Sequence, residues 1–137
     1  MNKILGITLI VMALGIAIVP AFTDCQSQGK AIVLSSGKTV PMKCHWTGIA
    51  EIATGVPLAA VGIMMTFTRR KNSLYTLSGM GGILGIFAVL LPTTLIGVCT
   101  NMTALCNTVM QPTLTAMGSV AIAGSLGAMV LARKASS

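Results

Sequence analysis

The sequence predicts an all-α membrane protein: a four-transmembrane-helix bundle with a small disulfide-closed outer β-hairpin loop. Three observations predict this class. Hydrophobic residues make up 54% of the 137 residues and charged residues only 8%, whereas a soluble domain carries roughly 25% charged residues. Four apolar runs are long enough to cross a bilayer, and all four cysteines fall between consecutive runs. A chain this apolar lacks the polar surface of a water-exposed globule, and the same composition excludes a disordered protein.

The predicted spans belong to a single integral membrane domain, residues 1–137. A helix needs about 20 apolar residues to cross a hydrocarbon core about 30 Å thick, because backbone amides must be satisfied within the segment where water is absent. Runs of that kind cover about residues 4–22, 46–68, 74–98 and 109–132. Segments of about 23–45 and 99–108 are then two loops on one side, and Glu51 is the clear charge inside a span.

Basic residues near the span ends predict the orientation, because Lys and Arg resist translocation and mark cytoplasmic segments. They stand at three places on one side of the predicted bundle: Lys3, Arg69–Lys71 and Arg133–Lys134. The opposite side holds Lys30, Lys38 and Lys43, a thinner basic load spread over a longer loop. We expect a multi-pass protein of the prokaryotic plasma membrane, with both termini cytoplasmic and the cysteine loops outside. Lys3 and the apolar run ending in Val19–Ala21 also resemble a cleavable secretory signal. The run is nearly a full span long, so we expect it to be retained.

The four cysteines bracket the two predicted outer loops. Cys25 and Cys44 flank the first loop, and Cys99 and Cys106 flank the second. Because thiols oxidise and stay oxidised outside the cytoplasm, we expect two disulfides, Cys25 with Cys44 and Cys99 with Cys106, although sequence alone permits three pairings. Each bridge would tie two consecutive helix ends, and closing a loop of about 20 residues contributes about 3 kcal/mol by the chain-entropy estimate.

Quinone-linked thiol–disulfide exchange is a functional alternative for these cysteines. Four-helix membrane enzymes of that kind also carry two outer cysteine pairs. They usually place one pair as C-x-x-C, which lowers a thiol pKa, and neither pair in this chain has that spacing. The catalytic reading therefore stays open beside the structural one.

The first predicted outer loop contains a hairpin signal. β-Branched residues stand on both sides of Ser35-Ser36-Gly37, within the segment from Lys30 to Met42. Gly37 supplies the positive φ that such a turn requires. Since a two-stranded hairpin is marginal by itself in water, this segment is either a contact surface for a partner or a lid over the bundle.

The densest group of chemically capable side chains lies where the first outer loop becomes the second span. It consists of Cys44, His45, Trp46, Thr47, Gly48 and Glu51. Helical spacing places Glu51 on a face with small residues, so its carboxylate points into the bundle. A charge in hydrocarbon costs several kcal/mol unless it is paired, hydrogen-bonded or protonated. Glu51 is therefore the first functional candidate, and as a structural group it would hydrogen-bond Thr47, Asn107 or Gln111.

His45 offers an alternative site for haem or copper. Imidazole and thioether ligands suit copper and haem iron, and the thioether would come from Met42, Met102 or Met110. The sequence has no C-x-x-C-H and no paired histidines, so we expect no metal and no cofactor. Trp46 is expected to anchor the chain at the membrane interface.

Small residues predict close packing of the third and fourth spans, because they let backbones approach in lipid. They are Gly81, Gly82 and Gly85 in the third span, and Gly124, Ser125, Gly127 and Ala128 in the fourth. Prolines inside the spans predict kinks or irregular turns. They are Pro57, Pro92 and Pro112.

The segment Met42–Glu51, followed by Gly55, resembles the signature M-x-C-H-W-T-G-x-A-E-x-x-x-G of a family of small prokaryotic four-span membrane proteins with no assigned function. The likeness covers the whole chain in span plan and cysteine placement. The resemblance marks as its motif Cys44, His45, Trp46, Thr47, Gly48 and Glu51. It implies a role beside export-type ABC permeases with a large outer domain, and no catalytic role carries over.

These observations favour a non-enzymatic protein, and we assign no catalytic residue. No Gly-rich phosphate loop and no nucleophile–base pair is visible in the sequence. Nucleic acid is excluded as a partner, because no basic stripe is interleaved with aromatic residues. We expect a binding or accessory subunit in the lipid bilayer, within a larger membrane complex such as an ABC-type exporter or within a homo-oligomer. A quinone-linked oxidoreductase and a haem- or metal-binding membrane protein are the alternatives.

Overall fold

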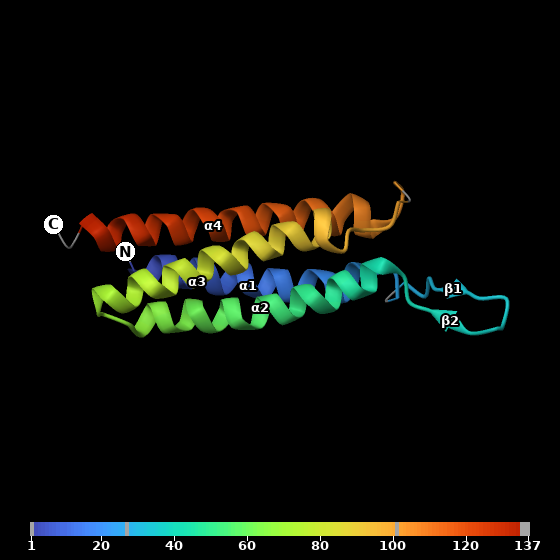
Figure 1. The fold of residues 1–137 in the computed structure, drawn as a ribbon, viewed down its shortest axis with the longest axis horizontal. Coiled ribbons are helices and arrows are strands. Elements are labelled where there is room, and N and C mark those ends of the chain that lie inside the picture. The colour runs from blue at the N-terminus through green and yellow to red at the C-terminus, as the bar shows by residue number, and fades with distance from the viewer. Residues whose placement is uncertain (1, 27, 101, 135–137) are drawn as a thin grey trace.

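Four long helices dominate the computed structural model, which describes residues 2–26, 28–100 and 102–134. They lie side by side (Figure 1) and are α1 (Asn2–Thr23), α2 (Lys43–Phe67), α3 (Lys71–Leu90) and α4 (Gln111–Lys134). Within these residues, four stretches are long and apolar enough to cross a membrane: Lys3–Thr23, Lys43–Phe67, Lys71–Leu95 and Cys106–Lys134. The prediction of a mostly helical chain with four helices of spanning length is confirmed.

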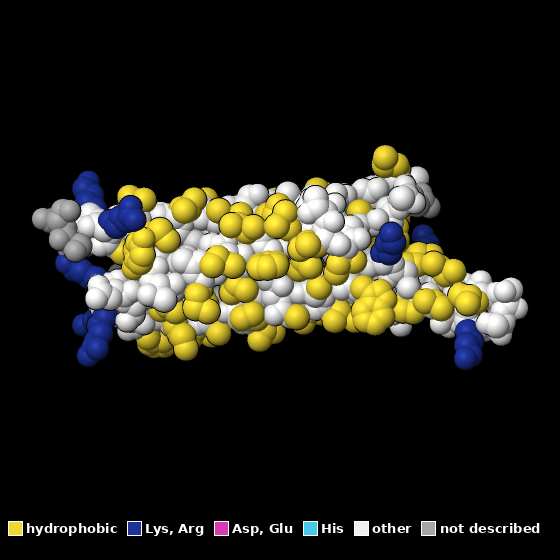
Figure 2. Space-filling view, in the orientation of Figure 1, with side chains coloured by type: hydrophobic (Ala, Val, Ile, Leu, Met, Phe, Trp, Pro, Cys, Tyr) yellow, Lys and Arg dark blue, Asp and Glu magenta, His cyan; other side chains and the backbone are white. Residues whose placement is uncertain are grey.

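The two ends of the bundle differ in chemistry. The start of α1, the connection from α2 to α3 and the end of α4 lie together at one end (Figure 1). This basic end carries Lys3, Arg69–Lys71 and Arg133–Lys134. The opposite end, called the cysteine end, carries the β-strands and the four cysteines. On the face drawn in Figure 2, Lys and Arg lie toward the two ends, and hydrophobic side chains cover the length between them.

Glycines bring the helices together in two close pairs. Between α1 and α2, a Cβ added to Gly62 would lie 3.1 Å from the carbonyl oxygen of Gly6. Between α3 and α4, a Cβ added to Gly118 would lie 3.1 Å from the carbonyl oxygen of Gly85. Backbones approach this closely only where small residues face each other, which favours helix association in lipid. The bundle is therefore built from two tightly packed pairs, α1–α2 and α3–α4.

The predicted small-residue segment of α4 is divided between two faces of the helix. Ser125 and Ala128 are buried, and a Cβ added to Gly81 of α3 would meet Ser125 Oγ at 2.8 Å. Gly124 and Gly127 face away, since a Cβ on either would meet nothing within 4 Å. The prediction that the third and fourth spans pack closely is confirmed, but these two glycines take no part in the packing, because the helical period turns them out of the inner face.

The third helix ends earlier than predicted. After α3, a π-helical turn, η1 (Leu91–Leu95), contains Pro92, which has no N–H to continue the α-helical ladder. The N–H groups of Ile96 and Gly97 donate to the carbonyl oxygen of Leu91 at 3.2 and 3.1 Å, and Gly97 has a φ of 77°. The helix therefore stops at Leu95 and not at residue 98. A second π-helical turn, η2 (Cys106–Met110), leads into α4.

A short antiparallel strand pair connects α1 with α2. Ile32 of β1 (Ile32–Val33) faces Val40 of β2 (Thr39–Val40), and Gly37 in the turn has a φ of 76°. All described side chains from Lys30 to Val40 are exposed. The pair extends beyond the helices at the cysteine end (Figure 1). The strands are therefore shorter than the hairpin predicted within residues 30–42, and the bundle does not cover them.

Candidate functional site

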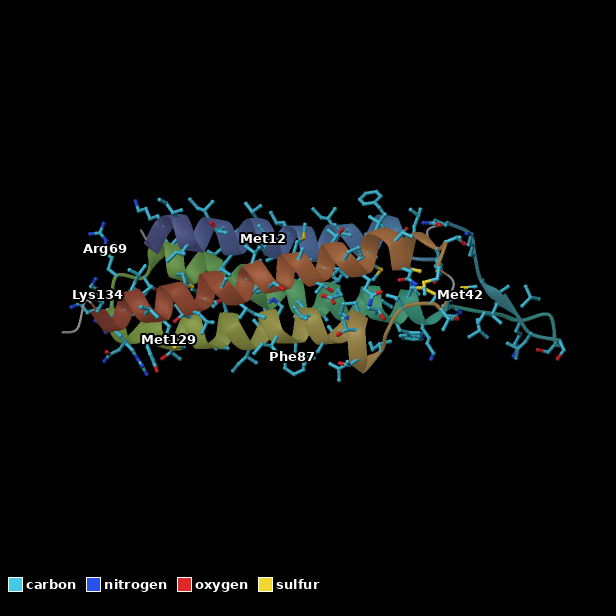
Figure 3. All side chains as sticks on the ribbon, turned by 90° about the horizontal axis from the view of Figure 1, so that it is seen from above. Met12, Met42, Arg69, Phe87, Met129 and Lys134 are labelled. Atoms are coloured by element: carbon cyan, nitrogen blue, oxygen red, sulfur yellow. A yellow bond between two sulfur atoms is a disulfide. The ribbon has the colours of Figure 1, made fainter. Side chains whose placement is uncertain are left out.

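Four cysteine sulfurs meet at the cysteine end, and each comes from a different helix end. Cys25 follows α1, Cys44 is the second residue of α2, Cys99 follows η1, and Cys106 begins η2. Their Sγ atoms all lie within 4.8 Å of one another. Figure 3 shows sulfur atoms gathered beside the labelled Met42, whose Sδ is 4.0 Å from Cys99 Sγ. These four residues, the four-cysteine cluster, join the ends of all four helices.

One disulfide crosses the cluster and links Cys44 to Cys99. Cys25 and Cys106 are buried free thiols. Cys25 Sγ lies 2.9 Å from Cys44 Sγ and 3.3 Å from Cys106 Sγ, and Cys44 Sγ lies 3.0 Å from Cys106 Sγ. The predicted pairing of each cysteine with its partner in the same loop is therefore wrong. Because the helix ends converge on one point, distance along the chain does not decide which sulfurs are bonded, and the disulfide does not close the β-strand loop.

The free thiol of Cys25 sits in surroundings that disfavour its thiolate. Burial raises the pKa of Cys25 from 9.0 to about 11, and the hydrogen-bonded Cys106 and the charge of Asp24 act in the same direction, while Lys30 opposes them. The thiolate is the nucleophile in thiol chemistry. Cys25 is therefore held as a neutral thiol at physiological pH, which suits a structural group better than an attacking one.

His45 is paired with Asp24, a residue that sequence reasoning missed. His45 Nδ1 lies 2.9 Å from Asp24 Oδ2, and both side chains are largely shielded from solvent. Asp24 directly precedes Cys25, and His45 directly follows Cys44. The signal for the pair was this adjacency, since the meeting of the two cysteines also brings their neighbours together. The Nδ1 atom of His45 therefore has a carboxylate as its partner and not a methionine sulfur.

The other members of the predicted cluster have separate surroundings. Thr47 is buried, and its hydroxyl donates to the carbonyl oxygen of Gly97 at 2.7 Å, which fixes the turn after η1 to α2. Trp46 is 55% exposed and packs edge-on against His45 with ring centroids 6.1 Å apart. Gly48 is buried against Pro20 of α1. These residues position the cysteine end of α2 against its neighbours.

Glu51 is fully buried inside the bundle, with 0% of its surface exposed. Among the described residues, neither carboxyl oxygen has a hydrogen-bond partner. The expected bonds to Thr47, Asn107 or Gln111 are therefore not formed, and the Asn107 side chain instead donates to Met102 Sδ at 3.7 Å. A carboxyl group in such a place costs several kcal/mol if it is charged, so Glu51 stays a functional candidate.

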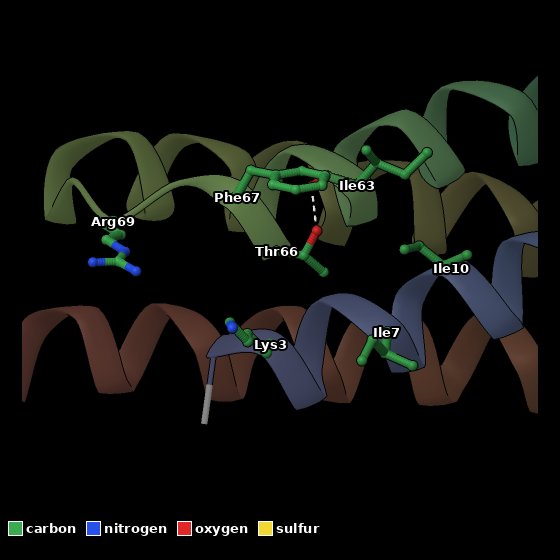
Figure 4. A pocket seen from close by; sticks show the side chains of 7 residues that line it. All are labelled: Lys3, Ile7, Ile10, Ile63, Thr66, Phe67 and Arg69. Atoms are coloured by element: carbon green, nitrogen blue, oxygen red, sulfur yellow. Dashed lines mark hydrogen bonds between the residues drawn. The ribbon is translucent and has the colours of Figure 1, made fainter.

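Grooves lie on the sides of the bundle, and two of them bear on function. At the basic end, a groove of about 510 Å³ between α1 and α2 is walled by Ile7, Ile10, Ile63 and Phe67, with Lys3 and Arg69 at its end (Figure 4).

The second groove, of about 580 Å³, lies over η1, η2 and α4. It is lined by polar and small residues, whose exposed atoms are mostly carbon: Thr93, Asn107, Gln111, Pro112, Thr115, Ala116 and Ser119. The hydroxyls of Thr93, Thr115 and Ser119 donate to backbone carbonyl oxygens one turn earlier. Sequence reasoning missed this polar surface. The spacing of four residues from Asn107 to Ser119 is the signal that marks it, because residues so spaced share one helix face.

Fold and site together define a class: a protein of four membrane-spanning-length helices whose ends meet at a cluster of four cysteine sulfurs. Residues 3–131 match the family model described as a domain of unknown function, DUF4418. The chain belongs to this family. No curated protein and no solved structure matches it.

Proposed function

We propose that this protein is a non-enzymatic accessory subunit that binds a transmembrane helix of a larger membrane protein. The observation that supports this function best is the polar groove on α4 and the π-helical turns beside it. In lipid there is no hydrophobic force between helices, so association depends on small residues and on interhelical hydrogen bonds. A helix face that carries carboxamides, hydroxyls and small residues therefore suits a partner helix better than it suits acyl chains.

The polar face continues along α4 as a row of small residues. Below Thr115 and Ser119 stand Ala123 and Gly127, each four residues further on. Ala123 is exposed, and a Cβ on Gly127 would meet nothing within 4 Å. By contrast, Gly118 is used inside the bundle against α3. The outward row is thus free of internal packing duties, as a docking face requires.

We place the protein in a prokaryotic plasma membrane with the basic end in the cytoplasm. Six of the nine Lys and Arg residues lie at that end, against Lys30, Lys38 and Lys43 at the other, and the richer side is the one retained in the cytoplasm. The cysteine end and the exposed strand pair would then lie outside, where disulfides persist. The export-type ABC permease that the sequence resemblance implies, with its large outer domain, is the partner that this orientation fits.

The test is affinity purification of the tagged full-length chain from native membranes in mild detergent. We expect a membrane protein with transmembrane helices to copurify. The variant Ala123→Leu adds bulk to the docking row, and Ala60→Leu, the same change at an exposed position of α2, is its matched control. Overpacking costs about 1–3 kcal/mol, and 1.4 kcal/mol is tenfold in affinity, so recovery of the partner should fall about tenfold or more in Ala123→Leu alone.

Two results would overturn this function. Equal recovery of the partner with both variants would show that the α4 face is not the docking site. Recovery of the chain as a monomer from native membranes would show that it has no stable partner. A complex that contains only copies of this chain and is lost in Ala123→Leu would replace the larger partner with a homo-oligomer.

A quinone-linked thiol–disulfide oxidoreductase is the second candidate, because one observation favours it. The Cys44–Cys99 disulfide has a free thiol, Cys25, 2.9 Å from one of its sulfurs. In the enzyme, the reduced Cys44 and Cys99 would pass two electrons and two protons to a quinone and re-form their disulfide. Rapid quinone-dependent reoxidation after mild reduction would support this candidate, and a disulfide that resists mild reduction would exclude it. The raised pKa of Cys25 is the reason we rank it second.

A further inference from the structure

We infer that the four-cysteine cluster, once the Cys44–Cys99 bridge is reduced, is a tetrahedral binding site for a soft divalent cation, with Zn²⁺ as the probe. The sequence alone does not predict a metal at the cysteines, because neither Cys25 and Cys44 nor Cys99 and Cys106 have the spacing of metal ligands. The inference does not depend on the proposed partner, because it concerns the end of the bundle and not the α4 face.

The positions of the sulfurs fit four-coordinate thiolate ligation. Zn–S bonds of about 2.3 Å give a tetrahedron with edges of about 3.8 Å. The non-bonded sulfur separations from Cys25 to Cys44, Cys106 and Cys99 are 2.9, 3.3 and 3.6 Å. No sulfur is more than 4.8 Å from another. Side-chain movements of less than about 1 Å would therefore bring the non-bonded pairs to the edge lengths of a zinc tetrahedron.

The cluster is enclosed in the manner of a structural metal site. Cys44, Cys106 and Cys25 are 0%, 1% and 4% exposed, and Cys99 is partly exposed. Structural zinc sites are closed by four protein ligands, whereas catalytic sites keep one position for water. With four sulfurs from four helix ends, this site has the ligand number of the closed type.

Two of the four cysteines lie at helix N-termini. Cys44 lies in the first turn of α2 and Cys106 begins the helical segment that continues as α4. Helix N-termini carry partial positive charge and stabilise thiolates. Four thiolates around Zn²⁺ leave a net charge of about −2, and the charge of the bound ion itself deprotonates a coordinating thiol.

The chemistry balances with named reagents. A water-soluble phosphine reduces the Cys44–Cys99 disulfide to two thiols and becomes a phosphine oxide, with water supplying the oxygen and the two hydrogens. Four thiols then bind one Zn²⁺ and release four protons to buffer. The metal would tie four helix ends at once, where the disulfide ties two.

The test uses the full-length chain, reduced in detergent without oxygen and titrated with Co²⁺ as the spectroscopic substitute for Zn²⁺. We expect one Co²⁺ per chain, with the visible bands of a tetrahedral site and the near-ultraviolet thiolate charge-transfer band of four sulfurs. Zn²⁺ should displace Co²⁺ and should protect all four thiols from alkylation, which intact mass reports. Cys25→Ser and Cys106→Ser should each weaken Co²⁺ binding by at least about tenfold.

His45→Ala is the matched control, because His45 adjoins the cluster without contributing a sulfur. It should keep the four-sulfur spectrum. No stoichiometric Co²⁺ on the reduced wild-type chain would overturn the inference, and so would a spectrum that survives Cys106→Ser but disappears in His45→Ala. The wild-type spectrum alone identifies the donor atoms, so the result does not require every cysteine variant to fold.

Discussion

The chain has only two acidic residues, and both are buried, but one has a charged-group partner and the other has no hydrogen-bond partner among the described residues. Asp24 is paired with His45 at the end of the bundle. Glu51 is fully buried within a span, and no described residue hydrogen-bonds its carboxyl oxygens. A carboxylate without a partner in hydrocarbon is expensive, whereas the neutral acid is tolerated. Glu51 is therefore the group of this chain that is suited to hold a proton inside the membrane.

Glu51 should react with dicyclohexylcarbodiimide, an apolar reagent that modifies protonated carboxyl groups. We expect one adduct per chain, because Glu51 is the carboxyl group in an apolar span and Asp24 is occupied by His45. Peptide mass mapping after labelling in the membrane locates the adduct. Labelling should vanish in Glu51→Gln and persist in Asp24→Asn. An adduct that survives Glu51→Gln would show that another carboxyl group reacts.

The thiol of Cys25 should alkylate slowly near neutral pH. Its pKa is raised from 9.0 to about 11, with burial as the largest cause, so the thiolate fraction grows only toward pH 11. The folded chain keeps this proton to higher pH than the unfolded chain does, so this group's contribution to the free energy of unfolding falls as pH rises from about 9 to about 11.

The measurement is the rate of iodoacetamide labelling followed by intact mass from pH 8 to pH 11, with the chemically unfolded, unreduced chain as the reference. Labelling of Cys25 should rise at higher pH than labelling of the unfolded reference. Equal rates in the folded and unfolded chains at pH 8 would contradict the expected protection.

At the scale of helices, the hydropathy of the sequence predicts that four helices exist more accurately than it predicts the residues at which they end. Four apolar runs were sufficient to find four helices, because a span must satisfy all its backbone groups internally. The end of the third helix was misplaced because Pro92 sits in a π-helical turn and the chain turns at Gly97. Which glycines pack was also only partly predictable. Gly85 faces Gly118 but Gly127 faces outward, and that depends on the rotation of α4 about its own axis.

Gly62 and Gly124 provide a direct test of the inward and outward glycines. A Cβ on Gly62 would stand 2.9 Å from Ile10 Cγ1 and 3.1 Å from Gly6 O, so Gly62→Ala should force α1 and α2 apart. Overpacking of about 1–3 kcal/mol exceeds the gain of about 1 kcal/mol that alanine brings to a helix. Gly124→Ala meets open space and should be neutral or stabilising by up to about 1 kcal/mol.

Thermal unfolding of both variants in the same detergent checks this pair, with far-ultraviolet circular dichroism as the signal. The melting temperature should fall for Gly62→Ala and hold or rise for Gly124→Ala. Equal losses in both variants would mean that glycine in these helices serves flexibility and not close approach.

At the scale of the whole molecule, the sequence was sufficient to group the cysteines at one end but not to pair them. The placement follows from span count alone, whereas bonding depends on how closely the helix ends converge. The convergence brings Cys25 within reach of three other sulfurs, so proximity along the chain does not decide which sulfurs are bonded. The pair of Asp24 and His45 could have been predicted, because the expected contact of Cys25 with Cys44 brings their neighbours together.

The orientation of the whole molecule can be tested with trypsin, because its basic residues lie on both sides of the predicted membrane. Lys38 stands in the exposed turn between β1 and β2, and exposed turns are preferred cleavage sites. Arg69–Lys71 form the connection at the basic end. In right-side-out vesicles we expect cleavage after Lys38 with the 69–71 connection intact, and in inverted vesicles the reverse. Lys38→Gln should remove the first fragment without affecting the second.

Cleavage at Arg69–Lys71 in sealed right-side-out vesicles would show that the orientation is the reverse of the proposed one. The four-cysteine cluster would then lie in the reducing cytoplasm, where metal binding would be favoured over the disulfide.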